Sequence, residues 1–347
     1  TSPIYCNYSQ LFMIPAFIVE SKWTPVVAIG ATALCVTQFF LFLKASFVVK
    51  KNRAKNVPIR CQSNNGHKDK VVAYVFDSPT PSISGSPFST KLTAYLRFTG
   101  IPHTVKEAQF EKAPKGKVPY IEHDGSFFGD SQLIIRYLEN TFDVSKMSVA
   151  ALKDLPNATN AFVPFDRLSP PDQGRSDAIR LICEGEVYWA VSGIRWCGDE
   201  GIGKNEALWK STQETFFSKI PSVIRGALTS MIRVSVNQAA IGQGFARHSP
   251  DDQFYLATRA LRSLSVQLGD QDFMLGDFPA ECDCIALGCV ECCLDDSRWP
   301  NMLTDFVRKE LPNLVQYVSR LRAMVFSDVA PGDLRPHSRD GVNPIKK

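Results

Sequence analysis

Three closely spaced serines, Ser84, Ser86 and Ser89, are the first residues of this sequence whose types could do chemistry, in the stretch SGSPFSTKL. Ser86 precedes a proline where a helical pattern begins, and a serine followed by a proline is an ordinary helix start. The same geometry suits an anion, because the backbone N–H groups and the dipole of a helix N-terminus favour negative charge. A hydroxyl there can donate a hydrogen bond to a bound thiolate. Redox cycling of the glutaredoxin type is excluded, because disulfide exchange needs thiolates at these positions.

Two further segments could bind a small polar ligand. Pro119 in GKVPYIEHDG interrupts a strand-like run, and because a proline cannot donate to a sheet it belongs at an edge, a strand start or a turn, where its bond can be cis. The peptide groups of Val118 would then be free to pair with an extended ligand, although a plain edge strand fits equally well. Asp130 and Ser131 open an apolar helix as normal caps, or they bind the ammonium and the carboxylate of an amino-acid head group.

These segments occur in an order that resembles a known family. The run SPFSTKLTAYLRFTGIPHTV…KAPKGKVPYIEHDGSFFGDSQLIIRYLENTF is similar to the thioredoxin-like half of glutathione transferases. The stretches EVYWAVSGIRW, GQGFARHSPDD, FMLGDFPAECDCIALG and LPNLVQYVSRLR resemble the helical half of the branch that contains failed axon connections and metaxin-related proteins. The resemblance implies an α/β thioredoxin-like N-terminal domain followed by an all-α glutathione-transferase C-terminal domain.

The resemblance also implies a role for each residue. Val118 would bond the cysteinyl backbone of glutathione, Pro119 would be the cis proline, and Asp130 with Ser131 would hold the γ-glutamyl end. Ser86 would be the catalytic group that faces the thiol. Enzymes of this type lower the pKa of the thiol so that the thiolate attacks an electrophile. We therefore expect glutathione as co-substrate, a small electrophile as second substrate and no metal.

Several assignments stay open. Ser84 and Ser89 compete with Ser86 for the catalytic position, because the loop before the helix is long and rich in proline. Three lysines either bind the glycyl carboxylate or form a solvated loop: Lys112, Lys115 and Lys117. The alternative function is a non-catalytic, metaxin-like adaptor or interaction module at a membrane surface. Other protein partners or a homodimer are compatible with both functions.

The cysteines need a separate interpretation. The chain has 10, without the evenly spaced pairs of a disulfide framework, so we expect reduced thiols. Five fall between Cys282 and Cys293, but no histidine accompanies them as in many structural zinc sites. Cys282, Cys289 and Cys293 share one helical face and are expected to pack as small buried hydrophobes.

The elements that must position these residues can be predicted from periodicity and turn residues. They are, in order, a strand at 71–76, a helix from 88 to 99 that stops at Gly100, a strand at 103–108, a hairpin at 118–128 with its turn at Asp124-Gly125, and a helix at 131–142. Beyond an irregular connection, further helices are predicted at 176–196, 250–268, 280–294 and 312–326. At the third of these, Asp283 has no Ser or Thr partner because residue 280 is alanine, and half a capping box costs about 1 kcal/mol.

The N-terminal region predicts a membrane anchor. PVVAIGATALCVTQFFLFL, residues 25–43, has 19 residues without a charge, close to the roughly 20 that span a bilayer. Lysines and arginines follow it without an acid, so the positive-inside rule predicts a single-pass protein whose folded part faces the cytoplasm. The net charge of +4, from 39 basic and 35 acidic residues, gives no concentrated cationic field for nucleic acid.

The complete prediction divides the chain into seven segments. They are an N-terminal segment (1–24), a transmembrane or signal-anchor helix (25–48), a basic polar linker (49–69), the thioredoxin-like domain (70–145), an interdomain linker (146–175), the helical domain (176–330) and a tail (331–347).

Overall fold

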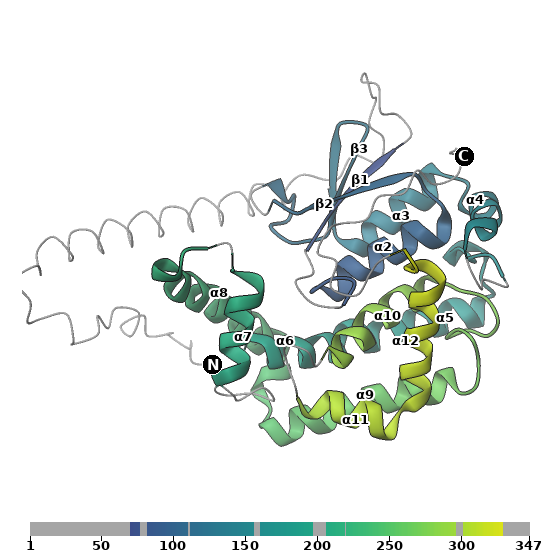
Figure 1. Cartoon of the computed structure of the whole chain (residues 1–347). Coiled ribbons are helices and arrows are strands. Elements are labelled where there is room, and N and C mark those ends of the chain that lie inside the picture. Colours follow the sequence, from purple (N-terminus) through teal and green to yellow (C-terminus); the bar gives the residue numbers. More distant parts are fainter. Residues whose placement is uncertain are drawn as a thin grey trace, which may run out of the picture. The chain divides into compact units, whose positions relative to one another are not determined.

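The structure is a computed structural model that describes residues 70–76, 82–109, 112–155, 160–196, 206–218, 220–295 and 301–328. All of these residues belong to the unit Val57–Lys347. Within this unit a small sheet with its own helices packs against a larger group of helices (Figure 1).

A four-stranded mixed sheet forms the first part. Its strands are β1 (Val71–Val75), β2 (His103–Glu107), β3 (Tyr120–His123) and β4 (Ser126–Gly129), in the order β2-β1-β3-β4. β1 pairs in parallel with β2 and antiparallel with β3, and β3 pairs antiparallel with β4. The β3–β4 turn has positive φ at Asp124 (51°) and Gly125 (73°), which suits a two-residue hairpin turn. The predicted strands and hairpin are confirmed.

Helix α2 (Pro87–Thr99) connects β1 to β2 and lies between the sheet and the helical part (Figure 1). It starts after Ser86 and ends where Gly100 adopts the left-handed conformation, with φ 68°, as the sequence predicted. Every residue of α2 except Phe88 is buried. A helix buried on all sides needs cover on two faces, and here the sheet (Figure 1) and α10 (Glu281–Leu294) provide it.

Helices α3 (Ser131–Thr141) and α4 (Val144–Ala151) pack beside α2. The sequence predicts a linker without helices at 146–175, and α4 overlaps its first residues. Helix α4 forms because the side chain of Asp143 accepts a hydrogen bond from the Lys146 N–H (3.4 Å) and caps the first turn.

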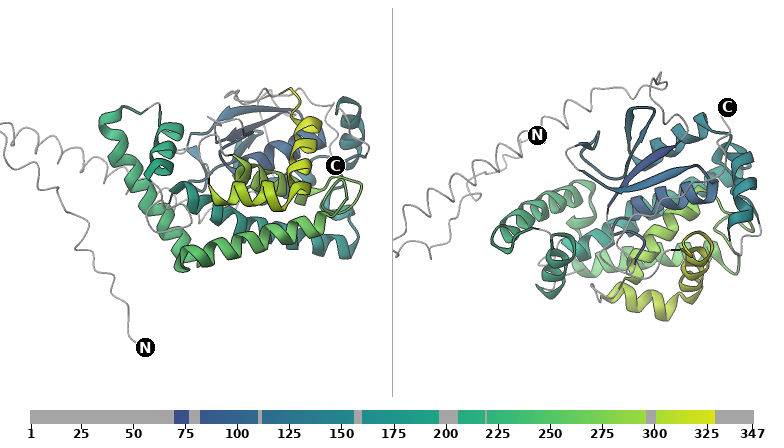
Figure 2. Two further views of the ribbon diagram at one scale, coloured as in Figure 1. Left: turned by 60° about the horizontal axis from the view of Figure 1, so that its bottom comes forward. Right: turned by 45° about the horizontal axis from the view of Figure 1, so that its top comes forward.

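The second part is made of helices that gather on the side of α2 opposite the sheet (Figure 2). They are α5 (Pro170–Ile182), α6 (Tyr188–Trp196), α7 (Glu206–Phe216), α8 (Ser222–Gln243), α9 (Pro250–Leu268), α10, α11 (Met302–Glu310) and α12 (Pro312–Val325). A π-helical turn, Cys183–Val187, joins α5 to α6, and short 3₁₀ turns occur at Leu152–Asp154, Phe165–Arg167 and Phe245–Arg247. Helix α9 is capped at its start, since Ser249 Oγ accepts from the Asp252 N–H at 3.2 Å.

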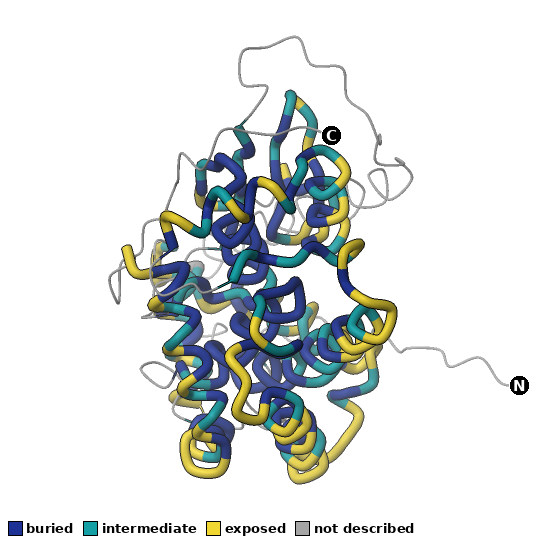
Figure 3. The backbone as a smooth tube through the Cα atoms, turned by 90° about the vertical axis from the view of Figure 1, so that its right-hand side faces the viewer, coloured by how far each residue is buried: buried dark blue, intermediate teal, exposed yellow. Residues whose placement is uncertain are grey.

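Helix α10 is the centre of the core and is buried along almost its whole length; in Figure 3 the buried residues are drawn dark blue. Its five cysteines are buried and free, and those of the predicted face pack in the core as expected. Gly288 allows α10 to approach α2 closely, because a Cβ atom built there would lie 2.4 Å from the carbonyl oxygen of Pro87.

The start of α10 depends on a buried carboxylate. Asp283 accepts hydrogen bonds from the Ala280 N–H, the Met274 N–H and the Tyr317 hydroxyl, each at 2.8 Å. Ala280 has no hydroxyl to complete the capping box, and the Asp283 N–H bonds instead to the Ala280 carbonyl at 3.0 Å. Burial raises the pKa of Asp283 to about 6.

The predicted membrane anchor needs correction. Across the residues that the structure describes, no helix combines the length and the apolar character that crossing a bilayer requires. The two longest, α8 and α9, carry charged and polar side chains along their length. The segment 25–48 lies outside the described residues. We therefore reduce the predicted fold class to the sheet part and the helical part, and withdraw the single-pass localisation.

Candidate functional site

The predicted site residues come together at one end of the sheet. The loop to Ser86 leaves the carboxyl end of β1, and β3 runs antiparallel to β1, so the Val118-Pro119 segment enters β3 at the same end. β4 returns antiparallel to β3 and pairs Gly129 with Tyr120, which brings Asp130 and Ser131 to that end too. A direct bond joins the two helix starts, since Lys91 Nζ on α2 lies 2.6 Å from Gln132 Oε1 on α3.

Ser86 differs from its two neighbouring serines. It occupies the N-cap position of α2, yet its hydroxyl accepts no bond from the helix and has no partner within the described part of the chain. Ser84 and Ser89 are buried, and their hydroxyls are used by the protein: Ser84 donates to the Phe76 carbonyl (2.6 Å), and Ser89 accepts from the Phe76 N–H (3.0 Å). Of the three competing hydroxyls, that of Ser86 is therefore the one left for a ligand.

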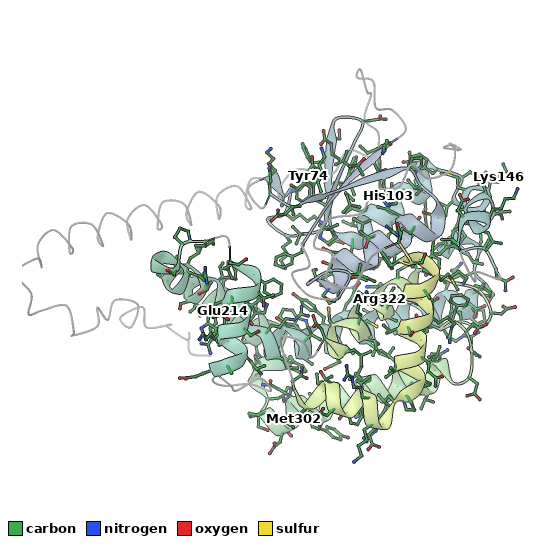
Figure 4. The ribbon with its side chains drawn as sticks, in the orientation of Figure 1. Tyr74, His103, Lys146, Glu214, Met302 and Arg322 are labelled. Carbon is green, nitrogen blue, oxygen red and sulfur yellow. The ribbon has the colours of Figure 1, made fainter. Side chains whose placement is uncertain are left out.

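The helical part holds the loop that leads to Ser86. Ser82 Oγ donates to Asp295 Oδ2 (3.1 Å), the Ile83 N–H donates to Glu291 Oε1 (3.2 Å), and Arg195 Nη1 donates to the Gly85 carbonyl. Glu291 also accepts from Arg322 of α12, whose place is marked in Figure 4. Burial raises the pKa of Glu291 to about 7, although Arg322 and the Ile83 N–H act in the opposite direction.

Aromatic rings surround the start of α2. The ring centroids of Phe88 and Tyr188 lie 4.8 Å apart, and those of Phe76 and Phe216 lie 5.0 Å apart. Phe216 reaches so close to the loop that a Cβ atom at Gly85 would lie 2.5 Å from its ring. Burial raises the pKa of Tyr188, so its hydroxyl stays protonated at neutral pH. Near Ser86 the helical part thus presents aromatic rings together with the Arg195 side chain, which bonds the Gly85 carbonyl.

The Val118-Pro119 segment lies just before β3. Its peptide bond is cis, as the resemblance implied. Within the described part of the chain, the N–H and C=O groups of Val118 have no hydrogen-bond partner, and the ladder with β1 begins only at Tyr120. Such unpaired peptide groups at a strand start can bind an extended ligand.

Asp130 and Ser131 form the N-terminus of α3. Asp130 Oδ1 accepts from the N–H groups of Gln132 (3.1 Å) and Leu133 (3.4 Å), while Asp130 Oδ2 lies 3.8 Å from Lys115 Nζ. The backbone of Asp130 has φ 85° and ψ 115°, a conformation that costs a non-glycine residue about 1 to 3 kcal/mol and is often found at functional sites. Ser131 is buried at the first helical position.

The cysteines of α10 supply no thiolate to this site. All six cysteines that the structure describes are buried and free, and burial raises the pKa of Cys292 to about 11. Burial raises the pKa of the other four thiols of α10 as well, so these five thiols stay protonated at neutral pH. Among the described residues no group of three or more His, Cys, Asp or Glu side chains is arranged to hold a metal ion.

Sequence reasoning missed Lys91. It is fully buried on α2 and contacts carboxylates of both Glu184 and Glu281. One sequence signal was present, because Lys91 lies between Phe88 and Tyr95 at helical spacing and so interrupts the apolar stripe.

Comparison with known proteins gives two family matches. The glutathione S-transferase N-terminal domain matches residues 87–201, and the glutathione S-transferase C-terminal domain matches residues 257–321. All the predicted binding residues fall within the first match, and it begins directly after Ser86.

Individual proteins are similar over longer ranges. The isoprene-epoxide–glutathione S-transferase of Rhodococcus sp. (strain AD45) is 30% identical over 273 residues, which cover 73% of this chain and 97% of that protein. Failed axon connections of Drosophila melanogaster is 24% identical over 302 residues, which cover 80% of this chain and 66% of that protein. The crystal structure of the beta-etherase LigF from Sphingobium sp. strain SYK-6 superposes with a TM-score of 0.49 and 19% identity over 74% of this chain and 99% of that one.

Proposed function

The chain belongs to the glutathione S-transferase family. From that premise we propose that it binds glutathione at the end of the sheet where Ser86, Val118 and Ser131 lie, and that it transfers the thiolate of glutathione to an electrophile. The observation that carries the proposal is the uncommitted hydroxyl of Ser86 at the N-terminus of α2. The neighbouring serine hydroxyls are bonded to the protein, so this one is free for a sulfur atom.

The α3 end of the site suits the γ-glutamyl group. A carboxylate would accept from the Ser131 hydroxyl and the first N–H groups of α3, where the helix dipole favours negative charge. The Asp130 carboxylate would bind the ammonium group. Its Oδ2 atom already has one cation nearby, since Lys115 Nζ lies 3.8 Å away. The peptide groups of Val118 would pair with the cysteinyl residue between the two ends.

The glycyl carboxylate would lie near the connection between β2 and β3. Lys112 and Lys117 are exposed there and Lys115 is partly exposed, so their ammonium groups can reach a ligand carboxylate without a desolvation cost. Such solvated pairs contribute little, roughly 0 to 1 kcal/mol each. We propose that they add to affinity but do not decide it.

The chemistry follows from Ser86. Its hydroxyl would donate a hydrogen bond to the thiolate, and a bond to a charged group is worth roughly 1 to 3 kcal/mol, which lowers the thiol pKa by about one to two units. The thiol proton leaves to solvent. The thiolate then forms a bond to a carbon of the electrophile as the bond from that carbon to its leaving oxygen or other group breaks.

We propose an uncharged electrophile, because the rings of Phe88 and Tyr188 line the helical side of the site. An epoxide is the first to try, since the 30% identical relative is named for an isoprene epoxide. In that case the C–O bond opens, and the resulting alkoxide takes a proton from water.

Calorimetric titration of reduced glutathione into the full chain tests binding. We expect saturable binding, weakened roughly ten- to hundredfold by Ser131→Ala, because a charge-assisted bond of about 1.5 to 3 kcal/mol is lost. Ser126→Ala, at the other end of β4, is the matched control and should bind like the wild type. If Ser131→Ala binds as tightly as the wild type, the γ-glutamyl end does not lie at α3.

A second candidate is a non-catalytic interaction module. The observation that supports this second candidate is the similarity to Failed axon connections over 80% of this chain. Absence of any heat with millimolar glutathione at two temperatures would favour this candidate and contradict the first.

A further inference from the structure

Lys91 is a fully buried lysine with three polar partners. Its Nζ atom lies 2.6 Å from Gln132 Oε1, 3.1 Å from Glu184 Oε1 and 3.3 Å from Glu281 Oε1. The exposed fraction of its side chain is 0%, so it cannot touch a ligand. A buried ammonium group persists only when it is paired, and this one is paired with groups from α3, the π-helical turn and α10.

The pairing continues to the surface of the helical part. Glu184 Oε2 accepts from Arg180 Nη1 at 3.1 Å, and Arg180 also bonds Asp177. Lys91 therefore connects the sheet part to a charged network that is anchored on α5 and α10. A displacement of any member would leave a charge unpaired in the interior, so the network holds its elements at a fixed spacing.

The link to the proposed site passes through Gln132. Lysine only donates, so the side-chain oxygen of Gln132 must face Lys91. Gln132 directly follows Ser131, and its N–H group is one of the two that bind the Asp130 carboxylate. Asp130 is held at φ 85°, and such a backbone persists only where its surroundings fix it. The Lys91–Gln132 bond is part of that fixation.

We infer that Lys91 is a positioning residue for the γ-glutamyl end of glutathione: through Gln132 it fixes the Asp130-Ser131 turn relative to Glu184 and Glu281. The inference rests on the proposed function, since it names a residue that acts on that binding site. Lys91 acts on affinity and not on the thiol, because Gln132, the partner through which it acts, lies at the start of α3 and not at Ser86.

The test compares two buried cations of α2. Arg97 is also buried and also joins α2 to the helical part, but it does so through the Val325 carbonyl at the end of α12 and through Asp328 just beyond it. Lys91→Met and Arg97→Met therefore each remove one buried cation of α2 that is paired with a carboxylate of the helical part. We expect calorimetry to show at least tenfold weaker glutathione binding for Lys91→Met and less than a twofold change for Arg97→Met. The pKa of the bound thiol should be the same in both as in the wild type.

Gln132→Leu tests the same link if Lys91→Met fails to fold, because it leaves Lys91 paired with both glutamates. It should weaken glutathione binding about as much as Lys91→Met does. The double variant Lys91→Met/Gln132→Leu should lose no more glutathione affinity than either single variant, because the two residues act through one bond. Wild-type affinity in Gln132→Leu would overturn the inference, as would equal losses in Lys91→Met and Arg97→Met.

Hydrogen exchange separates this inference from the proposed function. The amides of residues 131–134 should exchange faster in Lys91→Met or Gln132→Leu than in Arg97→Met, whether or not glutathione binds. If the wild type binds no glutathione, the proposed function fails and this comparison decides the positioning role alone. Equal exchange in all variants would contradict it.

Discussion

Replacing Gly288 by alanine should separate α10 from the start of α2. The added Cβ atom would lie 2.4 Å from the carbonyl oxygen of Pro87 and 3.1 Å from its C and Cα atoms, all of them backbone atoms that cannot rotate away. Relief requires a shift of the helix pair by more than half an ångström. Overpacking of this kind costs about 1 to 3 kcal/mol, and a gain of up to about 1 kcal/mol from helix propensity offsets part of it.

Urea unfolding measures the effect, with Gly174→Ala as the matched control. Gly174 lies inside α5, and nothing lies within 4 Å of a Cβ atom built there, so its replacement should stabilise the fold by about 0.5 to 1 kcal/mol. Gly288→Ala should lower the free energy of unfolding by about 1 to 2 kcal/mol and also weaken glutathione binding, because Ser86 adjoins Pro87. If Gly288→Ala is as stable as Gly174→Ala, the close approach of α10 to α2 is wrong.

Three further variants test the core and the choice of serine. In the folded protein the pKa of Asp283 is about 6, against 3.8 for the free side chain, so its contribution to stability is full below about pH 4 and is lost as the pH rises through about 6. Between these two pH values the free energy of unfolding of the wild type should fall by about 3 kcal/mol more than that of Asp283→Asn in denaturant titrations. Equal losses of unfolding free energy in the two proteins would refute the pKa shift. Ala280→Ser should complete the capping box and raise the free energy of unfolding by about 1 kcal/mol, seen as a higher urea midpoint. An unchanged midpoint would contradict this. Ser89→Ala removes the hydrogen bond that the Phe76 N–H donates to Ser89 Oγ. It should lower the free energy of unfolding by about 1 to 3 kcal/mol in the same assay without changing the pKa of the bound glutathione thiol. A change in that pKa would make Ser89 the catalytic serine.

Local signals in the sequence predicted the sheet part well. The proline after Ser86 marks the start of α2 and Gly100 marks its end, while Asp124-Gly125 marks the turn of the hairpin. Each of these residues restricts or permits particular backbone conformations by its own chemistry. The end of the sheet at which both Ser86 and Ser131 lie then follows from the order and pairing of the strands. None of this needs information from distant parts of the chain.

The parts that were missed depend on distant residues. Lys91 is understandable only when Glu184 and Glu281 are next to it, and no local pattern predicts that pairing. Helices α7 and α11 were not predicted, and α8 was missed because it combines β-branched residues, serines and glycines and buries little of its surface. The membrane anchor was predicted from 25–48 alone, and nothing in the described part of the chain supports it.

The ionisation of bound glutathione tests the central claim most directly. Ultraviolet absorbance of the thiolate, followed against pH with saturating glutathione, gives the pKa of the bound thiol in the wild type and in Ser86→Ala. We expect a wild-type pKa about one to two units below that of Ser86→Ala, with glutathione bound in both. The same pKa in the two proteins, or no bound glutathione in the wild type, would contradict the role given to Ser86.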